Sequence, residues 1–215
     1  CIDPYLSNSV KSLDGFDRLV PIPIKPKELD VDIIISTHDH MDHLDEETLK
    51  DTDWDNILYA GPDECVLHFH NIGIPDKNTL TINRGDEYKL RENISIMGTY
   101  AKHTEGSIGI ILTLDDTVIY FTGDSLYDEK LLVAGKYDPQ LLFCCINGKL
   151  GNMNYKDAAK LARQLDVKVA VPAHYGMFKE NTEDPNNFKK ELNDSGISYK
   201  ELKFNRSTCL SKILE

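Results

Sequence analysis

The sequence lacks several features that would assign it to common classes. No apolar run approaches the roughly 20 residues of a membrane-spanning helix, and the first residues, CIDPYLSNSV, have neither the basic start nor the apolar core of a signal peptide. The five cysteines form no C-x-x-C motif, so neither a disulfide framework nor a cysteine zinc site is indicated. These absences predict a cytoplasmic protein with reduced thiols and no membrane contact.

Positive charge is also scarce. Lysine and arginine number 24 against 36 aspartates and glutamates, giving a net charge of -12, and the basic residues form no cluster. Binding to a nucleic-acid backbone needs such a cluster, so we expect no nucleic-acid partner. The 215 residues contain no linker, internal repeat or low-complexity tract, and we expect one domain over 1–215.

Apolar patterning predicts strands and helices that alternate along the chain. After an irregular, proline-rich loop at 7–30, helices are expected at 44–51, 61–73, 125–135, 154–165 and 184–196. Strands are expected at 31–36, 56–60, 79–83, 87–90, 94–101, 108–114, 117–123, 139–146, 167–173 and, at an edge, 197–204. Tight turns at Gly85–Asp86 and Asp115–Asp116 indicate an antiparallel middle section. The pattern is typical of a layered α/β or α+β domain.

The densest chemical signal is THDHMDHLD at 37–45, directly after an expected strand. Five of the seven histidines fall just beyond such a strand, where open sheets place their ligand sites: His38, His40, His43, His103 and His174. Asp124 holds the same kind of position. Imidazole and carboxylate groups are the ligands expected for zinc, manganese or iron.

Each of these residues has an ordinary explanation when it is considered alone. The motif could be a solvated helix start, Asp124 could cap the helix that follows it, and single histidines are often structural. Their joint placement at strand ends favours a metal site. By contrast, His68 and His70 lie on an expected helix, where residues two apart point about 200° from each other, so we assign them to packing or surface.

The H-x-H-x-D-H motif, followed by a later histidine, aspartate and histidine, resembles that of the metallo-β-lactamase superfamily. GPDECV, INRGDEYKL and INGKLGNMN are similar in particular to the group of L-ascorbate-6-phosphate lactonase, over most of the chain up to about Leu192. The resemblance implies an αββα four-layer sandwich. Family members normally carry one or two strands and a glycine-rich turn before CIDPYL, which this sequence lacks.

The resemblance also implies a dinuclear site. It assigns His38, His40 and His103 to the first metal and Asp42, His43 and His174 to the second, with Asp124 bridging the two ions. Asp3 would support the site without touching metal. Related flavodiiron oxidoreductases have glutamate where this sequence has His40, so the histidine favours a hydrolase.

The implied chemistry uses two divalent ions, manganese or zinc with iron as a third option, and a metal-bound hydroxide. We expect it to attack a small anionic lactone or ester, such as a sugar-acid phosphate lactone, with Asp42 or Asp124 relaying the proton. Candidate substrate contacts are Asn147, Lys149, Asn152 and Tyr175. Two alternatives stay open: a phosphodiester or thioester hydrolase on the same fold, and a non-catalytic metal-binding regulatory domain. A small-molecule substrate is the expected partner, and a homo-oligomer is compatible with the sequence.

Overall fold

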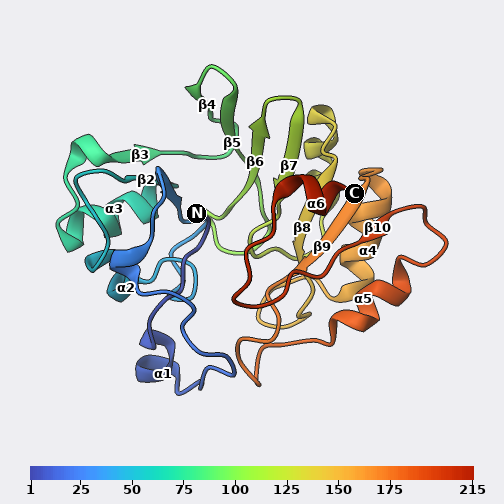
Figure 1. Cartoon of the computed structure of the whole chain (residues 1–215), viewed down its shortest axis with the longest axis horizontal. Coiled ribbons are helices and arrows are strands. Elements are labelled where there is room, and N and C mark those ends of the chain that lie inside the picture. Colours follow the sequence, from blue (N-terminus) through green and yellow to red (C-terminus); the bar gives the residue numbers. More distant parts are fainter.

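The computed structural model describes residues 1–215 and contains two β-sheets that lie side by side in Figure 1. The smaller sheet is parallel throughout, with the order β1 (Ile33–Ile35), β2 (Leu58–Gly61) and β3 (Thr79–Thr81). Its strands are short, and β1 and β2 are mostly apolar and buried, which is typical of parallel strands covered on both sides, whereas the edge strand β3 is half-buried.

The larger sheet has seven strands in the order β10-β9-β8-β7-β6-β5-β4. Its antiparallel half contains β4 (Glu87–Arg91), β5 (Ile94–Tyr100), β6 (Ile108–Leu114) and β7 (Thr117–Phe121). Its parallel half continues from β7 through β8 (Leu141–Cys145), β9 (Val169–Ala173) and β10 (Ser198–Tyr199). The parallel strands end at one edge, and this common edge positions the site.

Helices cover the outer face of each sheet. The small sheet packs against α2 (Glu46–Lys50) and α3 (Asp63–Ile72). The large sheet packs against a 3-10 segment, η3 (Glu129–Tyr137), and against α4 (Tyr155–Gln164) and α5 (Pro185–Glu191). The four layers are therefore helix, sheet, sheet and helix, which confirms the predicted α/β sandwich of the metallo-β-lactamase type.

The core between the two sheets is built of β-branched side chains. Ile35 of the small sheet and Ile82 beyond its last strand pack with Ile96, Ile108 and Ile110 of the large sheet, and all five are buried. Burying each of these side chains contributes about 1.5–3 kcal/mol. The packing fixes the distance between the sheets and hence the loops at their common edge.

Two expectations about the first half of the chain were wrong. Residues 7–30 are not wholly irregular, because α1 (Ser9–Asp14) and the 3-10 segment η1 (Pro26–Glu28) lie within them. Helix α1 ends at Gly15, whose φ of 76° suits glycine. The strand expected at 79–83 does not join the antiparallel ladder. It pairs with β2, so Gly85–Asp86 connects the two sheets instead of closing a hairpin.

The second half departs from expectation at helix boundaries and at the end of the chain. The helix expected at 125–135 is a 3-10 segment that begins only at Glu129, and the closing edge strand has two residues. The sequence patterns did not predict α6 (Leu210–Leu214), whose Ile213 packs on the inner face of the large sheet against Leu141. A further 3-10 turn, η2 (Asp76–Asn78), precedes β3.

The longest α-helices, α3 and α4, have ten residues each. No helix combines the length and the apolar character that crossing a bilayer requires.

Candidate metal centre

The histidine-rich motif forms the loop between β1 and α2. Thr37, His38 and His43 are buried, whereas His40 is exposed at the surface of the loop. The loop turns back on itself, because the backbone amides of His43 and Leu44 both donate to the carbonyl of His40. Three imidazoles of one short segment are thereby gathered on one side.

Three further side chains reach the same place from the large sheet. His103 follows β5, Asp124 follows β7 and His174 follows β9. The structure therefore brings together all seven residues that the sequence singled out, including Asp42 of the motif. They come from four strand ends that are up to 136 positions apart between His38 and His174.

One cluster consists of His38, His40 and His103. His40 Nδ1 lies 3.0 Å from His38 Nε2 and 3.0 Å from His103 Nε2. Three ring nitrogens thus converge on a small volume, with the ring planes of each pair steeply inclined. This is the arrangement of three ligand atoms around one cation position.

The second cluster consists of Asp42, His43 and His174. His43 Nε2 lies 3.2 Å from His174 Nε2, and Asp42 Oδ2 lies 3.4 Å from His174 Nε2 and 3.7 Å from His43 Nε2. Asp124 stands between the two clusters. Its Oδ1 is 3.4 Å from His43 Nε2, while its Oδ2 is 3.2 Å from His174 Nε2 and 3.9 Å from His103 Nε2.

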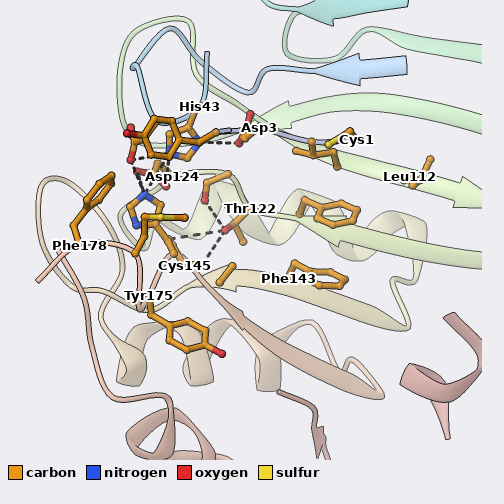
Figure 2. A pocket seen from close by; sticks show the side chains of 18 residues that line it. Cys1, Asp3, His43, Leu112, Thr122, Asp124, Phe143, Cys145, Tyr175 and Phe178 are labelled. Carbon is orange, nitrogen blue, oxygen red and sulfur yellow. Dashed lines mark hydrogen bonds and ion pairs between the residues drawn. The ribbon is translucent and has the colours of Figure 1, made fainter. Parts of the chain in front are cut away.

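Asp3 anchors the motif loop through hydrogen bonds to Thr37 and His43. Its carboxylate accepts the backbone N–H of Thr37 at 2.7 Å and the Thr37 hydroxyl at 2.8 Å. His43 Nδ1 donates to Asp3 Oδ2 at 2.7 Å, and Figure 2 shows Asp3 and Asp124 close to His43. Because Nδ1 donates to Asp3, Nε2 of His43 faces the centre, and a neutral ring would offer its lone pair there.

The protein raises the pKa of two histidines at the centre and lowers that of two others. Burial lowers the pKa of His38 to about 2 and also lowers the pKa of His103. Burial also works against the protonation of His43 and His174, but nearby carboxylates, chiefly Asp124, outweigh it. The pKa of His174 is raised to about 9, and that of His43 lies well above its usual range.

The carboxylates show the complementary effect. Burial opposes the ionisation of Asp42 and Asp124, yet His43 and His174 hold the pKa of both groups below its usual range. The centre is therefore a compact set of opposite charges taken out of water, which is unusual unless it serves a function.

The donor set fits divalent cations. His38 and His40, like His43 and His174, point ring nitrogens at each other at 3.0–3.2 Å, so a proton or a cation must lie between them. Asp124 Oδ1 is buried and has no hydrogen-bond partner within the chain. An anionic oxygen left in this state is costly unless it meets a positive charge.

Two of the residues hold a strained backbone conformation. His174 has a φ of 56° and Asp3 a φ of 48°, both in the left-handed region. Such residues cost about 1–3 kcal/mol each and persist where the surrounding structure fixes them, often at functional sites. Both side chains contact the motif loop, Asp3 at Thr37 and His174 at His43.

The centre opens to solvent through a pocket of about 460 Å³. His40, Asp42, His103 and Asp124 form its floor. Its walls, which we call the mouth, are Val10, Asp14, Phe16, Asp39, Met41, Leu150, Phe178 and Asn181. The mouth contains two carboxylates and neither lysine nor arginine.

A second cavity of about 590 Å³ approaches the centre from the other side and is shown in Figure 2. It runs from His43 and Asp124 between the sheets, along Leu112, Phe121 and Phe143. Its walls are mainly apolar, and no charged side chain lies in the part away from the centre. The mouth is also largely apolar, but it differs from this cavity in carrying Asp14, Asp39 and Asn181 among its apolar side chains.

The four candidate substrate contacts lie outside the mouth. Asn147 is buried and donates to Asn181 Oδ1 at 2.6 Å, and the Lys149 ammonium donates to the Glu180 carbonyl at 3.0 Å. Tyr175 lines the cavity between the sheets. Their contact with substrate stays a prediction.

Asn152, the fourth candidate, is buried against Asp124, and its amide donates to Asp124 Oδ2 at 2.7 Å. The sequence patterns did not indicate this partnership, the hydrogen bonds of Thr37 to Asp3, or the mouth residues on and near α1. Thr37 could have been found, because it adjoins the motif. Nothing in the pattern of residues 7–30 pointed to the mouth.

Comparison with known proteins places residues 1–175 in the family described as the beta-lactamase superfamily domain. A UPF0173 metal-dependent hydrolase of Pyrobaculum islandicum is 30% identical over 196 residues, which cover 89% of this chain and 82% of that protein.

Solved structures share the fold. A possible metal-dependent hydrolase from Veillonella parvula superimposes with a TM-score of 0.78 at 15% identity, covering 95% of this chain and 90% of that one. Igni18, a metallo hydrolase from Ignicoccus hospitalis, gives a TM-score of 0.71 at 23% identity, covering 82% and 78%.

Proposed function

Since the chain belongs to the beta-lactamase superfamily and, within it, to the UPF0173 metal-dependent hydrolases, we propose that it hydrolyses a small lactone or ester at a dinuclear metal centre. The observation that carries the proposal is the convergence of seven histidine and aspartate side chains at the floor of a solvent-facing pocket. Structural residues have no reason to be gathered in this way from four strand ends.

We assign His38, His40 and His103 to one ion and Asp42, His43 and His174 to the other, with Asp124 shared by both. The converging nitrogen atoms and Asp124 Oδ1, which has no hydrogen-bond partner within the chain, support this assignment. The imidazole and carboxylate donors suit zinc, manganese and iron alike, so the donor set selects none of the three.

Divalent ions held there would lower the pKa of a water molecule and polarise a substrate carbonyl. The chain itself contributes orientation and a route for a proton. The side chain of Asp42 is 24% exposed, and its Oδ2 faces His174. Asp124 is held by Asn152, His43 and His174. We therefore assign to Asp42 the transfer of a proton from the attacking water to the leaving oxygen.

The charge of the mouth bears on the substrate. The resemblance favours a phosphorylated sugar-acid lactone, for which Lys149 would have to bind the phosphate. That ammonium is engaged by the Glu180 carbonyl, and the mouth presents Asp14 and Asp39 instead. We therefore propose an uncharged lactone or ester, because two carboxylates would repel an anion at the entrance.

The test is hydrolysis of a lactone and ester panel by the protein loaded with manganese, zinc or iron, with chelated protein as the control. Turnover that disappears with chelation is expected. An uncharged lactone should be hydrolysed at least as efficiently as its phosphorylated counterpart. A clear preference for the phosphorylated compound that Lys149→Ala abolishes would contradict the proposed charge preference.

A regulatory metal-binding domain is the alternative from another class. Tight metal binding without turnover of any lactone, ester, thioester or phosphodiester would favour that alternative. Turnover of a phosphodiester or thioester alone would retain the hydrolase and replace the proposed substrate class.

A further inference from the structure

The segment Asn147–Asn154, with the sequence NGKLGNMN, forms a closed loop after β8. An isolated bridge joins Asn147 to Asn154, and the Gly148 amide donates to the Met153 carbonyl at 2.9 Å. Gly148, Leu150 and Gly151 all have positive φ values, of 64°, 49° and 87°. This tightly turned segment lies next to the metal centre but contributes none of the seven converging side chains, so its shape needs another explanation.

The loop touches the centre at two successive residues. His103 Nδ1 lies 3.2 Å from the Gly151 carbonyl oxygen, and the Asn152 amide donates to Asp124 Oδ2 at 2.7 Å. The Met153 amide donates to the Ser125 carbonyl at 2.7 Å, which ties the loop to the residue after Asp124.

Close approach of the loop to His103 requires glycine. A Cβ atom at position 151 would lie 2.9 Å from His103 Nδ1, and the φ of 87° is itself unfavourable for other residues. With Nδ1–H donated to the Gly151 carbonyl, His103 Nε2 presents its lone pair to His40 and the first cation position.

Asn152 orients Asp124 by a hydrogen bond, as Gly151 orients His103. The residue is 3% exposed, it does not line the mouth, and its amide donates one side-chain hydrogen bond, to Asp124 Oδ2. That bond fixes the plane of the carboxylate and leaves Oδ1, which has no partner, toward His43 Nε2 at 3.4 Å. Each carboxylate oxygen thereby faces a histidine of the second cluster, and Oδ2 also lies toward His103.

We propose that Asn152 is a positioning residue that holds Asp124 in the orientation needed to bridge the two cations, and that Gly151 of the same loop fixes His103. The proposal rests on the proposed function, because it needs two cations to be bound. A residue that only filled space would not be polar here, since burying an amide whose Oδ1 has no partner is unfavourable.

The test measures metal binding instead of turnover. Asn152→Leu keeps a similar volume and removes the donor, and Asn152→Ala, which cannot clash, replaces it if the leucine variant does not fold. Asn154→Ala is the matched control. Asn154 is an asparagine of the same loop whose Oδ1 accepts from the backbone N–H groups of Lys156 and Asp157 at the start of α4.

Cobalt(II) is titrated into metal-free protein, with chelator competition for affinity and the visible spectrum for ligand geometry. We expect Asn152→Leu to bind the weaker ion about 10–100-fold less tightly and to change the spectrum of the doubly loaded form. Asn154→Ala should lower the melting temperature and leave affinity and spectrum unchanged.

Wild-type affinity and spectrum in folded Asn152→Leu, or in the alanine variant used in its place, would overturn the proposal while leaving the dinuclear centre intact. Failure of the wild type to bind cobalt, zinc or manganese would instead contradict the proposed function itself, so the two failures can be told apart.

Discussion

Two His-x-His pairs with the same spacing differ in where their side chains lie: one pair converges at the metal centre and the other does not. His38 and His40 lie in the loop after β1 and converge with His103. His68 and His70 lie on α3, where His68 Nδ1 pairs with Glu46 at 3.0 Å and His70 Nε2 contacts Thr79 at 3.2 Å. The spacing of ligand-type residues is therefore not what makes a site. The backbone that carries them decides whether their side chains can converge.

The helical pair fails for a geometric reason. Residues two apart on an α-helix point in nearly opposite directions, so His68 and His70 find partners on different neighbours. The loop pair succeeds because the reversal of the chain at His40 places both rings on one side, where a third ring from β5 can join them. Removing members of each pair should accordingly have very different effects.

The largest effect is expected from Asp124→Asn. The amide is nearly isosteric but neutral, so it cannot offset the repulsion between two cations that share it. Removing a group that only hydrogen-bonds a metal ligand already costs up to about 100-fold in activity. We therefore expect kcat of the metal-loaded variant, which changes a ligand itself, to fall by more than that. Steady-state kinetics and thermal unfolding of the same sample check this. An unchanged kcat in the fully loaded variant would remove Asp124 from its bridging position.

His43→Ala should come next. This change removes one of the three side chains of the second cluster and leaves Asp42 and His174 there. The first cluster, His38, His40 and His103, is unchanged. We expect one ion to stay bound, with little activity, as measured by elemental analysis of reloaded protein. Two tightly bound ions in this variant would contradict the assignment of His43.

A moderate effect of pH is expected on the metal-free protein. The pKa of His174 is raised to about 9 in the folded state and that of His43 is also raised, so their protonation stabilises the fold. That contribution is fully present below the unfolded-state pKa, about 6.5, and is lost as the pH rises through about 9. Below pH 6.5 the lowered pKa of His38 acts in the opposite direction.

The melting temperature in chelator should therefore fall between pH 7 and pH 9.5, by a few degrees, because about 1 kcal/mol moves it by about 2–4 °C in a chain of this size. The loaded protein should not show this loss, since cations replace the protons. His174→Asn is the control and should flatten the metal-free profile. A melting temperature that rises over this window in metal-free wild type would contradict the charge state assigned to the centre.

The smallest effect belongs to the helical pair. Replacing His68 and His70 together with alanine should leave the metal content unchanged, and the free energy of unfolding should shift by no more than about 0.5 kcal/mol per site, as for other surface changes. His68 pairs with the half-buried Glu46 and His70 lies 3.4 Å from the exposed Asp76, and ion pairs this accessible to water contribute little. Loss of a metal equivalent in this double variant would break the contrast between the two pairs.

The convergence at the centre could be foreseen because it follows from local rules. Apolar patterning shows where strands end, and a residue just beyond a strand lies at the edge of the sheet. The sequence was therefore enough to group His103, Asp124 and His174 with the motif. Their division between two ions came only from the resemblance and stays a proposal. The extent of the domain, the cellular location and the oligomeric state likewise stay predictions.

What could not be foreseen depends on how distant segments pack. The partnership of Asn152 with Asp124 joins residues 28 positions apart, and no periodicity marks it. The mouth depends on how residues 7–30 cross the motif loop, and their proline-rich composition gave only an irregular loop. The strand at 79–83 was placed in the wrong sheet because a short apolar run and a Gly–Asp turn are equally compatible with a hairpin and with a crossing between sheets.

Metal content of the wild-type chain tests the central claim most directly. Protein stripped with chelator, reloaded with zinc or manganese and freed of excess metal should retain two equivalents per chain by elemental analysis, while the His68 and His70 double variant retains the same two. One equivalent or less in the wild type would contradict a dinuclear centre built from these seven side chains.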